Sequence, residues 1–436
     1  MLLTKLFFIF LSILSVVGFG QDVGDKLIIK KSYFSYLDYV FDHDSSFFFF
    51  GQTNSSYHGS LSGTANTDIT ILRTNYVGDI LNDITIYNHG SDQIDNVKLG
   101  KDGFFYIAVS NYQTDILNDN FVRIIKTDGI SLHWETRIET FCKDMFILND
   151  AILIIGNAKE INERGGYSIL TNSLDFFVLD FKGNIRTQKK ITCLTSIIDE
   201  VGRLGQMKFF LSKTNEKKIG IIASIELSNS QSSKFCPART IQSTSTTFYI
   251  KDLLFFIDSS FNLIQDFKCF ESNADEFSIT YNENSDIISS LGSIKELDEN
   301  KIDYRNPFRI TFQMFNFAFV KSINDLNGKS INTYIFPHSY DTVWGFIESN
   351  DTIGFLIVRN RNASLTKHLI GLKTSNKSIN EFIRFSISEE RSELSICSTI
   401  LKDGFIYIFG LQNNDQNYSS NLYDVVFQKV KIINDL

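Results

Sequence analysis

Proline and methionine are scarce in this sequence. Its 436 residues include 3 Pro and 4 Met, against 41 Phe and 17 Tyr. Beyond the first twenty residues, no segment has the apolar spacing of a long amphipathic helix, which argues against a helical fold. The apolar residues occur instead in short bursts typical of β-strands. Since 43% of the residues are hydrophobic, the chain can bury one large core or two ordinary ones.

A basic stripe is also missing. The formal net charge is −8, and acidic and basic residues are interleaved along the chain. Nucleic acid is therefore excluded as a partner, because its binding requires a concentration of Lys and Arg on one face. The sequence contains no nucleophile elbow, phosphate-binding loop or dinucleotide fingerprint, and its six histidines show no metal-binding spacing. No enzyme class is indicated by a motif.

Long hydrophobic runs are confined to the N-terminus. Lys5 precedes an apolar stretch over residues 6–17, and Gly18 and Gly20 place small residues before Gln21. This pattern predicts a signal peptide over residues 1–20 and a secreted or extracytoplasmic protein, in a periplasm or at a cell surface. The stretch is shorter than the ~20 residues that span a bilayer, so a retained anchor is the weaker interpretation. We expect no membrane span after the leader is removed.

The cysteines lack any metal-binding arrangement. The chain has five of them, widely separated and with no Cys-x-x-Cys pair: Cys142, Cys193, Cys236, Cys269 and Cys397. An oxidising compartment would allow disulfides between Cys142 and Cys193 or between Cys236 and Cys269. The alternative for each cysteine is a buried small apolar residue.

What the sequence does contain is an internal repeat. An apolar burst recurs seven times, at residues 47–51, 104–108, 152–156, 219–223, 286–290, 353–357 and 405–410. The bursts are spaced by roughly 45 to 70 residues, in the range of propeller blades with variable loops. Each follows a shorter strand and a turn rich in Asp and Asn, which tolerate the positive φ of a hairpin.

A second pair of strands follows each burst. The predicted turn residues between them are Gly78, Gly129, Gly183, Asn262, Gly328 and Asn376. These units predict an all-β fold, a β-propeller of seven four-stranded blades. The blades are expected at residues 33–90, 91–139, 140–200, 201–271, 272–337, 338–389 and 390–436, all in one domain over 21–436. A strand over residues 26–32 would complete the last blade and close the ring.

Two other architectures remain open, a pair of β-sandwiches and a β-solenoid. A sandwich does not need a repeated four-strand unit, and a solenoid repeats at shorter, more uniform spacing. The repeating order is an apolar strand, an Asp-Gly turn, an aromatic burst, a polar loop and two further strands, and its latter half is clearest in the second unit, over residues 120–134. In this order the chain resembles the secreted bacterial β-propeller repeat proteins. The resemblance implies a fold and an extracytoplasmic location, and no activity.

Aligning the seven units brings out a recurring acidic position just before the first strand. It is occupied by Asp38, Asp95, Asp144, Asp275, Asp341 and Glu393, with Gln206 in the fourth unit. Because first strands line a propeller's channel, these carboxylates are candidate ligands for Ca²⁺ or Mg²⁺, or an acid/base pair. The alternative is that each carboxylate accepts backbone N–H groups and ties the blades together. Repetition in every unit favours this structural role.

Three functions are consistent with these features. The leading hypothesis is a secreted or cell-surface binding scaffold that presents the loops at residues 52–66, 159–173 and 227–245 to a protein or glycan ligand. The second is a carbohydrate-active hydrolase or lyase that uses two of the carboxylates at the channel mouth. The third is a structural envelope protein without a ligand. No cofactor is indicated other than the Ca²⁺ considered above.

Overall fold

The computed structural model describes the chain in segments. They are residues 23–54, 67–87, 90–112, 121–157, 159–161, 167–169, 173–191, 203–212, 218–227, 239–242, 247–272, 276–282, 287–297, 315–340, 342–348, 353–359, 367–375, 378–387, 394–413 and 423–431. These segments contain strands and turns but no helix. In particular, the described part holds no helix long and apolar enough to cross a membrane.

The strands form antiparallel sheets that we number in chain order. Sheets 1 to 3 pair strands as follows: β2 (Tyr36–His43), β3 (Ser46–Asn54), β4 (Thr67–Thr74) and β5 (Ile80–Ile86); β6 (Ser91–Leu99), β7 (Phe105–Tyr112), β8 (Phe121–Thr127) and β9 (Leu132–Ile138); β10 (Phe141–Ile147), β11 (Ile152–Asn157), β14 (Leu174–Leu179) and β15 (Ile185–Ile191). A separate hairpin joins β12 (Lys159–Ile161) to β13 (Tyr167–Ile169).

Sheets 4 to 6 follow the same order. They contain β16 (Arg203–Ser212), β17 (Lys218–Leu227), β19 (Thr247–Ile257) and β20 (Leu263–Cys269), with β18 (Arg239–Gln242) also on β19; β21 (Glu276–Asn282), β22 (Ile287–Leu297), β23 (Phe315–Asn324) and β24 (Ser330–Tyr340); β25 (Thr342–Glu348), β26 (Ile353–Arg359), β27 (Lys367–Ser375) and β28 (Ser378–Ile387).

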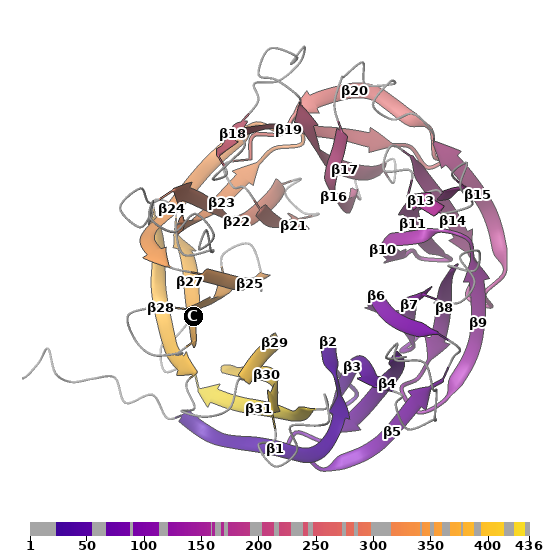
Figure 1. Cartoon of the computed structure of the whole chain (residues 1–436), viewed down its shortest axis with the longest axis vertical. Coiled ribbons are helices and arrows are strands. Elements are labelled where there is room, and N and C mark those ends of the chain that lie inside the picture. The colour runs from indigo at the N-terminus through magenta and orange to yellow at the C-terminus, as the bar shows by residue number, and fades with distance from the viewer. Residues whose placement is uncertain are drawn as a thin grey trace, which may run out of the picture.

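Sheet 7 combines the two ends of the chain. It contains β29 (Leu394–Lys402), β30 (Phe405–Asn413) and β31 (Tyr423–Lys431), and its fourth strand is β1 (Val23–Phe34). Strand β1 pairs antiparallel with β31, for example Leu27 with Phe427. In Figure 1 this sheet lies beside sheet 1, so the first and last described strands lie side by side.

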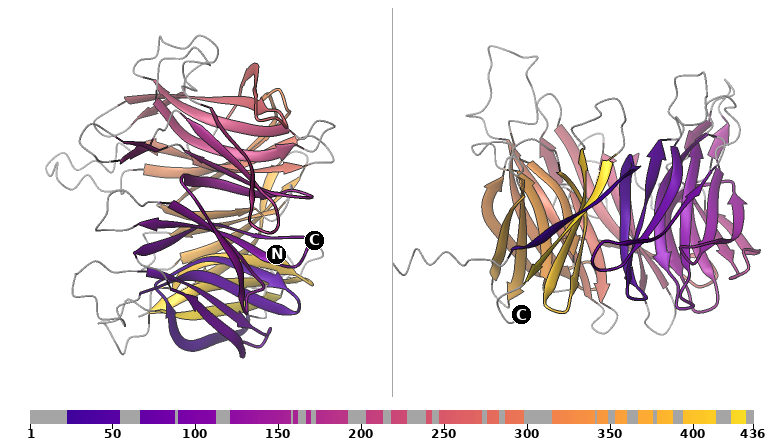
Figure 2. Two further views of the ribbon diagram at one scale, coloured as in Figure 1. Left: turned by 90° about the vertical axis from the view of Figure 1, so that its right-hand side faces the viewer. Right: turned by 90° about the horizontal axis from the view of Figure 1, so that it is seen from below.

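The sheets stand radially around a central opening, which is the arrangement of a β-propeller (Figure 1). The first strand of each sheet, such as β2, β6 and β10, lies innermost, and the last, such as β5, β9 and β15, lies on the rim. The side views show the sheets stacked face against face, with the strands running across the thickness of the ring (Figure 2).

The core lies between neighbouring sheets. One apolar cluster joins sheets 1 and 2, another sheets 2 and 3, and others sheets 3 and 4, 4 and 5, and 7 and 1. The second strand of a sheet is covered on both faces, so β11 is buried at every position, as continuous apolar bursts predict. The outer strand faces water on one side, and β15 is therefore mostly exposed and rich in Lys and Arg.

The turns between third and fourth strands differ from prediction in one place. Positive φ angles occur at Gly78, Gly129, Gly183 and Gly328, as expected. In sheet 4 the residue with positive φ is Phe261, at 59°, so the prediction of Asn262 was wrong. Asn262 instead occupies the last position of the turn, where its carbonyl accepts the N–H of Asp258 at 3.0 Å. Asn376 lies outside the described residues.

One of the two predicted disulfides is contradicted by the structure. Cys142 carries a free thiol, so a disulfide with Cys193 is not formed. The thiol lies 3.7 Å from the carbonyl oxygen of Asp144. Cys269 is disulfide-bonded, and its partner lies outside the described residues.

Candidate functional site

Three of the predicted acidic residues come together at the inner ends of sheets 1 to 3. Asp38, Asp95 and Asp144 lie on β2, β6 and β10, the innermost strands of adjacent sheets. Burial and the charges of all three carboxylates raise the pKa of the Tyr39 phenol, so the three carboxylates lie around this one side chain. We call Asp38, Tyr39, Asp95, Asn96 and Asp144 the inner cluster. The other predicted residues Asp275, Asp341 and Glu393 lie outside the described residues.

A β-bulge positions the first two carboxylates. In β2, Leu37 pairs with Gly51 and Tyr39 with Phe50, so Asp38 is the extra residue. In β6, Ile94 pairs with Val109 and Asn96 with Ala108, so Asp95 is the extra residue. Bulges redirect a side chain out of the regular ladder and are frequent beside functional sites.

Asp144 occupies a different position in its strand. In β10, Cys142 pairs with Gly156 and Asp144 with Ile155, so the extra residue is Lys143. Asp144 therefore corresponds to Tyr39 and Asn96, the residues after the bulge in β2 and β6. The sequence alignment had matched it to Asp38 and Asp95, one residue away.

Residues after the bulge connect neighbouring sheets. The Tyr39 hydroxyl donates to the carbonyl oxygen of Asp95 at 3.0 Å, from sheet 1 to sheet 2. The Asn96 side-chain N–H donates to the Asp144 carboxylate at 2.8 Å, from sheet 2 to sheet 3. Asp144 also accepts the N–H of Met145 at 2.8 Å. Asp144 thus accepts one hydrogen bond from a side chain of the neighbouring sheet and one from a backbone N–H of its own strand.

Asp38 and Asp95 have fewer partners. Asp38 accepts a 3.3 Å hydrogen bond from the side chain of Gln52, and Asp95 accepts one of 2.5 Å from the hydroxyl of Ser110. Both donors belong to the same sheet as the carboxylate they contact. Neither carboxylate forms an ion pair within the described residues. These two side chains therefore do not join the sheets to each other.

The pKa values of the cluster reflect this environment. Burial raises the pKa of Asp38 to about 6, against the hydrogen bond from Gln52. Burial likewise raises the pKa of Asp95 to about 7, and the charge of Asp38 adds to the effect, while Ser110 and Lys143 oppose it. Burial also raises the pKa of Asp144, opposed first by the charge of Lys98. At neutral pH, Asp95 is consequently divided between its neutral and charged forms.

One buried acceptor in the cluster is unsatisfied. Asn96 is 9% exposed, and its side-chain oxygen accepts no hydrogen bond from the described residues. Buried amide oxygens rarely lack a donor, since the loss costs about 1–3 kcal/mol. The half-buried carboxylates of Asp38 and Asp95 offer acceptor positions to a donor-rich ligand, whereas the Asn96 oxygen is enclosed. Carboxylate oxygens are also suitable metal ligands. The described residues, however, include no group of three His, Cys, Asp or Glu side chains arranged to hold one metal ion.

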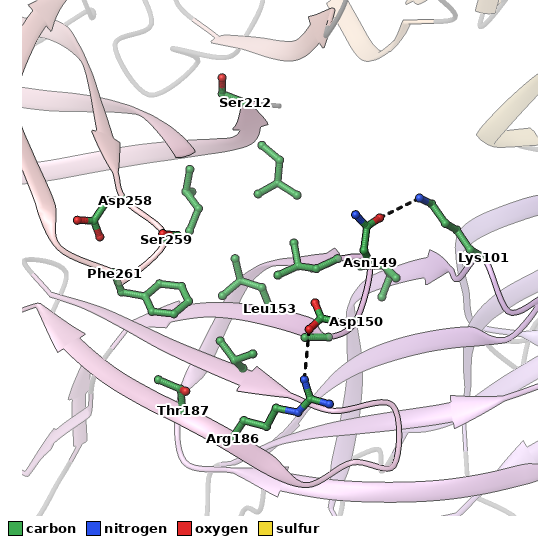
Figure 3. A pocket seen from close by; sticks show the side chains of 16 residues that line it. Lys101, Asn149, Asp150, Leu153, Arg186, Thr187, Ser212, Asp258, Ser259 and Phe261 are labelled. Atoms are coloured by element: carbon green, nitrogen blue, oxygen red, sulfur yellow. Dashed lines mark hydrogen bonds and ion pairs between the residues drawn. The ribbon is translucent and has the colours of Figure 1, made fainter. Parts of the chain in front are cut away.

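A cavity lies between sheets 3 and 4 (Figure 3). It has a volume of about 400 Å³ and is lined largely by apolar side chains, with Lys101, Asp150 and Arg186 among its polar residues. Arg186 pairs with Asp150 at 3.5 Å. Nothing in the sequence analysis pointed to this cavity, because the residues that form it come from three sheets.

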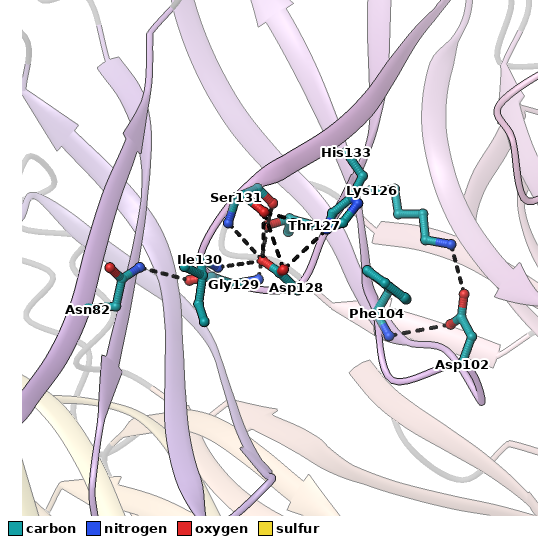
Figure 4. A network of polar contacts seen from close by, with 10 residues as sticks. All are labelled: Asn82, Asp102, Phe104, Lys126, Thr127, Asp128, Gly129, Ile130, Ser131 and His133. Carbon is teal, nitrogen blue, oxygen red and sulfur yellow. Dashed lines mark hydrogen bonds and ion pairs between the residues drawn. The ribbon is translucent and has the colours of Figure 1, made fainter.

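Aspartates of the outer turns form a contrasting set (Figure 4). Asp128 accepts the N–H groups of Ile130 and Ser131 at 2.8 and 2.7 Å, and its other oxygen lies 3.2 Å from His133. Burial opposes the effect, but these hydrogen bonds lower the pKa of Asp128 to about 2. The carbonyl of the adjacent Gly129 accepts from Asn82 of sheet 1 at 3.3 Å, so this turn also joins neighbouring sheets.

The same construction recurs in later turns. The Asp180 carboxylate accepts from the N–H groups of Lys182 and Asn184, and Asp258 does so from Ser260 and Asn262. The side-chain hydrogen bond of Asn184 and the backbone hydrogen bond of Asn262 are the largest causes that lower the pKa of Asp180 and Asp258. An Asp three residues before a Gly, or four before an Asn, was a signal for these turns in the sequence.

The inner cluster also contains residues that sequence reasoning missed. Tyr39 and Asn96 each directly follow a predicted aspartate, and that adjacency was the available signal. The loops at residues 52–66, 159–173 and 227–245, predicted to bind a ligand, lie mostly outside the described residues.

Comparison with known proteins gives the following. No protein-family model matches the sequence, and no curated protein matches it. Solved structures with a similar arrangement include the polysaccharide lyase Uly1, with a TM-score of 0.48 and 10% identity over 92% of this chain and 93% of that one. The β-propeller domain of the Trilobed protease from Pyrococcus furiosus has a TM-score of 0.41 and 8% identity, covering 92% and 98%. Hsv2 of Kluyveromyces lactis has a TM-score of 0.36 and 9% identity, covering 94% and 100%. Likeness at this level carries no conclusion about activity.

Proposed function

We propose that this chain is a secreted β-propeller that binds a neutral glycan at the inner cluster. The observation that carries the proposal is the state of Asp38 and Asp95, two half-buried carboxylates that form no ion pair with the described residues. Sugar hydroxyls are donors that satisfy such acceptors without adding charge to a buried site. An anionic sugar would be repelled by the ionised fraction of the cluster.

The architecture proposed with it is a ring of seven blades, formed by sheets 1 to 7 and closed where β1 completes the last sheet. The pairing of β1 with β31 supports this closure, because it leaves no open edge between the two ends of the chain. The disulfide at Cys269 and the predicted signal peptide support secretion, since disulfides persist in oxidising compartments.

A second candidate function is hydrolysis or lytic cleavage of the same class of ligand. It is favoured by the raised pKa values of Asp38 and Asp95, about 6 and about 7. Carboxyl groups with pKa values near the working pH are the ones that can donate or accept a proton during a reaction. In this case Asp95, the more protonated of the two, is the general acid and Asp38 the base.

The proposal is tested by applying the purified protein to immobilised neutral, uronate-containing and sulfated oligosaccharides. We expect binding to neutral glycans that falls at least tenfold in an Asp38→Asn/Asp95→Asn double variant. Asp266→Asn is the matched control, because this residue is exposed and lies on β20 at the rim. Binding that prefers sulfated sugars, or that survives the double substitution, would overturn the proposed site.

The same incubations separate binding from catalysis. Release of new reducing ends or of unsaturated products would establish the second function, provided that Asp95→Asn abolishes the release. Addition of Ca²⁺ or a chelator tests the metal interpretation of the cluster. We expect glycan binding to be unchanged by either, and dependence on Ca²⁺ would assign the carboxylates to a metal instead.

A further inference from the structure

The cavity between sheets 3 and 4 exists because one residue position is smaller there than in the preceding sheets. Phe48, Tyr106 and Leu153 occupy equivalent positions in β3, β7 and β11, where they pair with Phe41, Lys98 and Phe146 of the first strands. Phe48 and Tyr106 fill the space toward the next sheet with an aromatic ring. Leu153 leaves part of that space open and lines the cavity.

The contacts of the two aromatic rings show how closely this space is filled elsewhere. A Cβ atom on Gly129 would lie 2.4 Å from the Phe48 ring, so the turn of sheet 2 touches that ring directly. The Tyr106 ring has its centroid 5.8 Å from that of Phe181 and 6.1 Å from that of Trp134. Both rings are therefore in contact with the neighbouring sheet.

The third strand follows the same trend. A cation covers the aromatic ring in the first two sheets, with Arg73 5.1 Å from the Phe48 centroid and Lys126 5.3 Å from that of Tyr106. The residue paired with Leu153 is Val178, which is shorter and lines the cavity. Two large side chains are thus replaced by two small ones at a single interface.

The turn that faces the cavity carries an unusual residue. Where the turns of sheets 2, 3 and 5 have a glycine at positive φ, sheet 4 has Phe261 at 59°. A bulky side chain in this region is strained, and such strain is retained where the side chain serves a purpose. The ring of Phe261 stacks on Phe176 with centroids 5.4 Å apart and forms one wall of the cavity (Figure 3).

The charged side chains that line the cavity differ in the partners they have. Arg186 is paired with Asp150 at 3.5 Å, and the Asp258 carboxylate accepts N–H groups of its own turn. Among the described residues, the polar contact of the Lys101 ammonium group is with a neutral group, the side-chain oxygen of Asn149 at 3.0 Å. Lys101 therefore stands beside an apolar cavity as a cation without an acidic partner among the described residues (Figure 3).

From these features we propose that the cavity binds a small amphipathic carboxylate, with its apolar body against Leu153, Val178 and Phe261 and its carboxylate on Lys101. A volume of about 400 Å³ suits a ligand of this size. The apolar lining provides affinity by burial, and the ammonium group selects an anionic head. This site is separate from the inner cluster and does not depend on the function proposed for it.

The test is calorimetric titration of the purified protein with decanoate and with decanol. We expect decanoate to bind one to one, and Leu153→Phe to abolish binding, because the larger ring refills the space as Phe48 does in sheet 1. Leu211→Phe fills the cavity from sheet 4 and serves if Leu153→Phe does not fold. Thermal unfolding by circular dichroism establishes that each variant is folded.

Substitution of the cation tests the orientation of the ligand. We expect Lys101→Met to weaken decanoate binding at least fivefold and to leave decanol binding unchanged. Lys182→Met is the matched control, because Lys182 is exposed on the outer turn of sheet 3 and does not line the cavity. Absence of decanoate binding, or binding that persists in both folded cavity-filling variants, would overturn the proposal. Equal loss of decanoate and decanol in Lys101→Met would overturn the role of Lys101.

Discussion

Two sets of aspartates in this propeller have opposite properties. Those of the outer turns, such as Asp128, each accept two backbone N–H groups, and these hydrogen bonds lower their pKa values. Asp38 at the inner end of sheet 1 accepts a hydrogen bond from the Gln52 side chain, and Asp95 of sheet 2 accepts hydrogen bonds from Ser110, but burial raises the pKa values of both. The outer carboxylates stabilise the fold, whereas the inner ones cost stability when ionised. Aspartates that destabilise a fold are better explained by binding than by structure.

Of the substitutions that test this comparison, Asp95→Asn is expected to have the largest effect on the free energy of unfolding. Between pH 4 and 7 the folded protein retains a proton on Asp95 that the unfolded chain has released. The free energy of unfolding therefore falls as the pH rises through this window and stays low above it. Removing the carboxylate should raise the free energy of unfolding at pH 8 by about 4 kcal/mol at most. It should change little at pH 3, where both states are largely protonated. Urea denaturation at the two pH values measures the difference.

A loss of stability at pH 8 in Asp95→Asn would contradict this difference between the inner and the outer aspartates. Such a loss would mean that the charged carboxylate contributes to the fold, as those of the outer turns do. Asp266→Asn again provides the control, since it removes a carboxylate of the exposed rim.

A smaller effect of opposite sign is expected from Asp128→Asn. The pKa of Asp128 is lowered to about 2, so its charge stabilises the folded state above the ordinary pKa, and this contribution is lost as the pH falls toward 2. Because the side chain is 37% exposed, solvent screening reduces the effect, and we expect a loss of about 1 kcal/mol at pH 7. Urea denaturation at pH 7 measures it. A gain in stability would show that the Asp128 carboxylate of the outer turn does not stabilise the fold.

The sequence predicted the positions of the strands well. It predicted less well which residues of different repeats are equivalent at the inner rim. The apolar bursts at residues 47–51 and 152–156 correspond to β3 and β11, because a strand covered on both faces leaves a continuous apolar run in the sequence. A bulge leaves no such trace, since any residue can be the extra one. For this reason Asp144 was matched to Asp95, although Lys143 is the residue equivalent to Asp95.

The candidate site was predictable only in part for a related reason. Asp38 and Asp95 were identified because acidic residues recur at one position of the repeat. Asn96 and Tyr39 were missed because they differ from one repeat to the next, and their role depends on the hydrogen bonds that cross to the neighbouring sheet. The cavity was missed because it results from the absence of a large side chain at Leu153, which becomes apparent only beside Phe48 and Tyr106.

The account is tested most directly by the titration of the inner carboxyl groups themselves. Carbon-13 NMR of protein labelled at the aspartate carboxyl carbon, with signals assigned from Asp38→Asn and Asp95→Asn, gives both pKa values. We expect about 6 for Asp38 and about 7 for Asp95. Values for both at or below the ordinary aspartate pKa would contradict the account, because the inner carboxylates would then be ionised and stabilised like those of the outer turns.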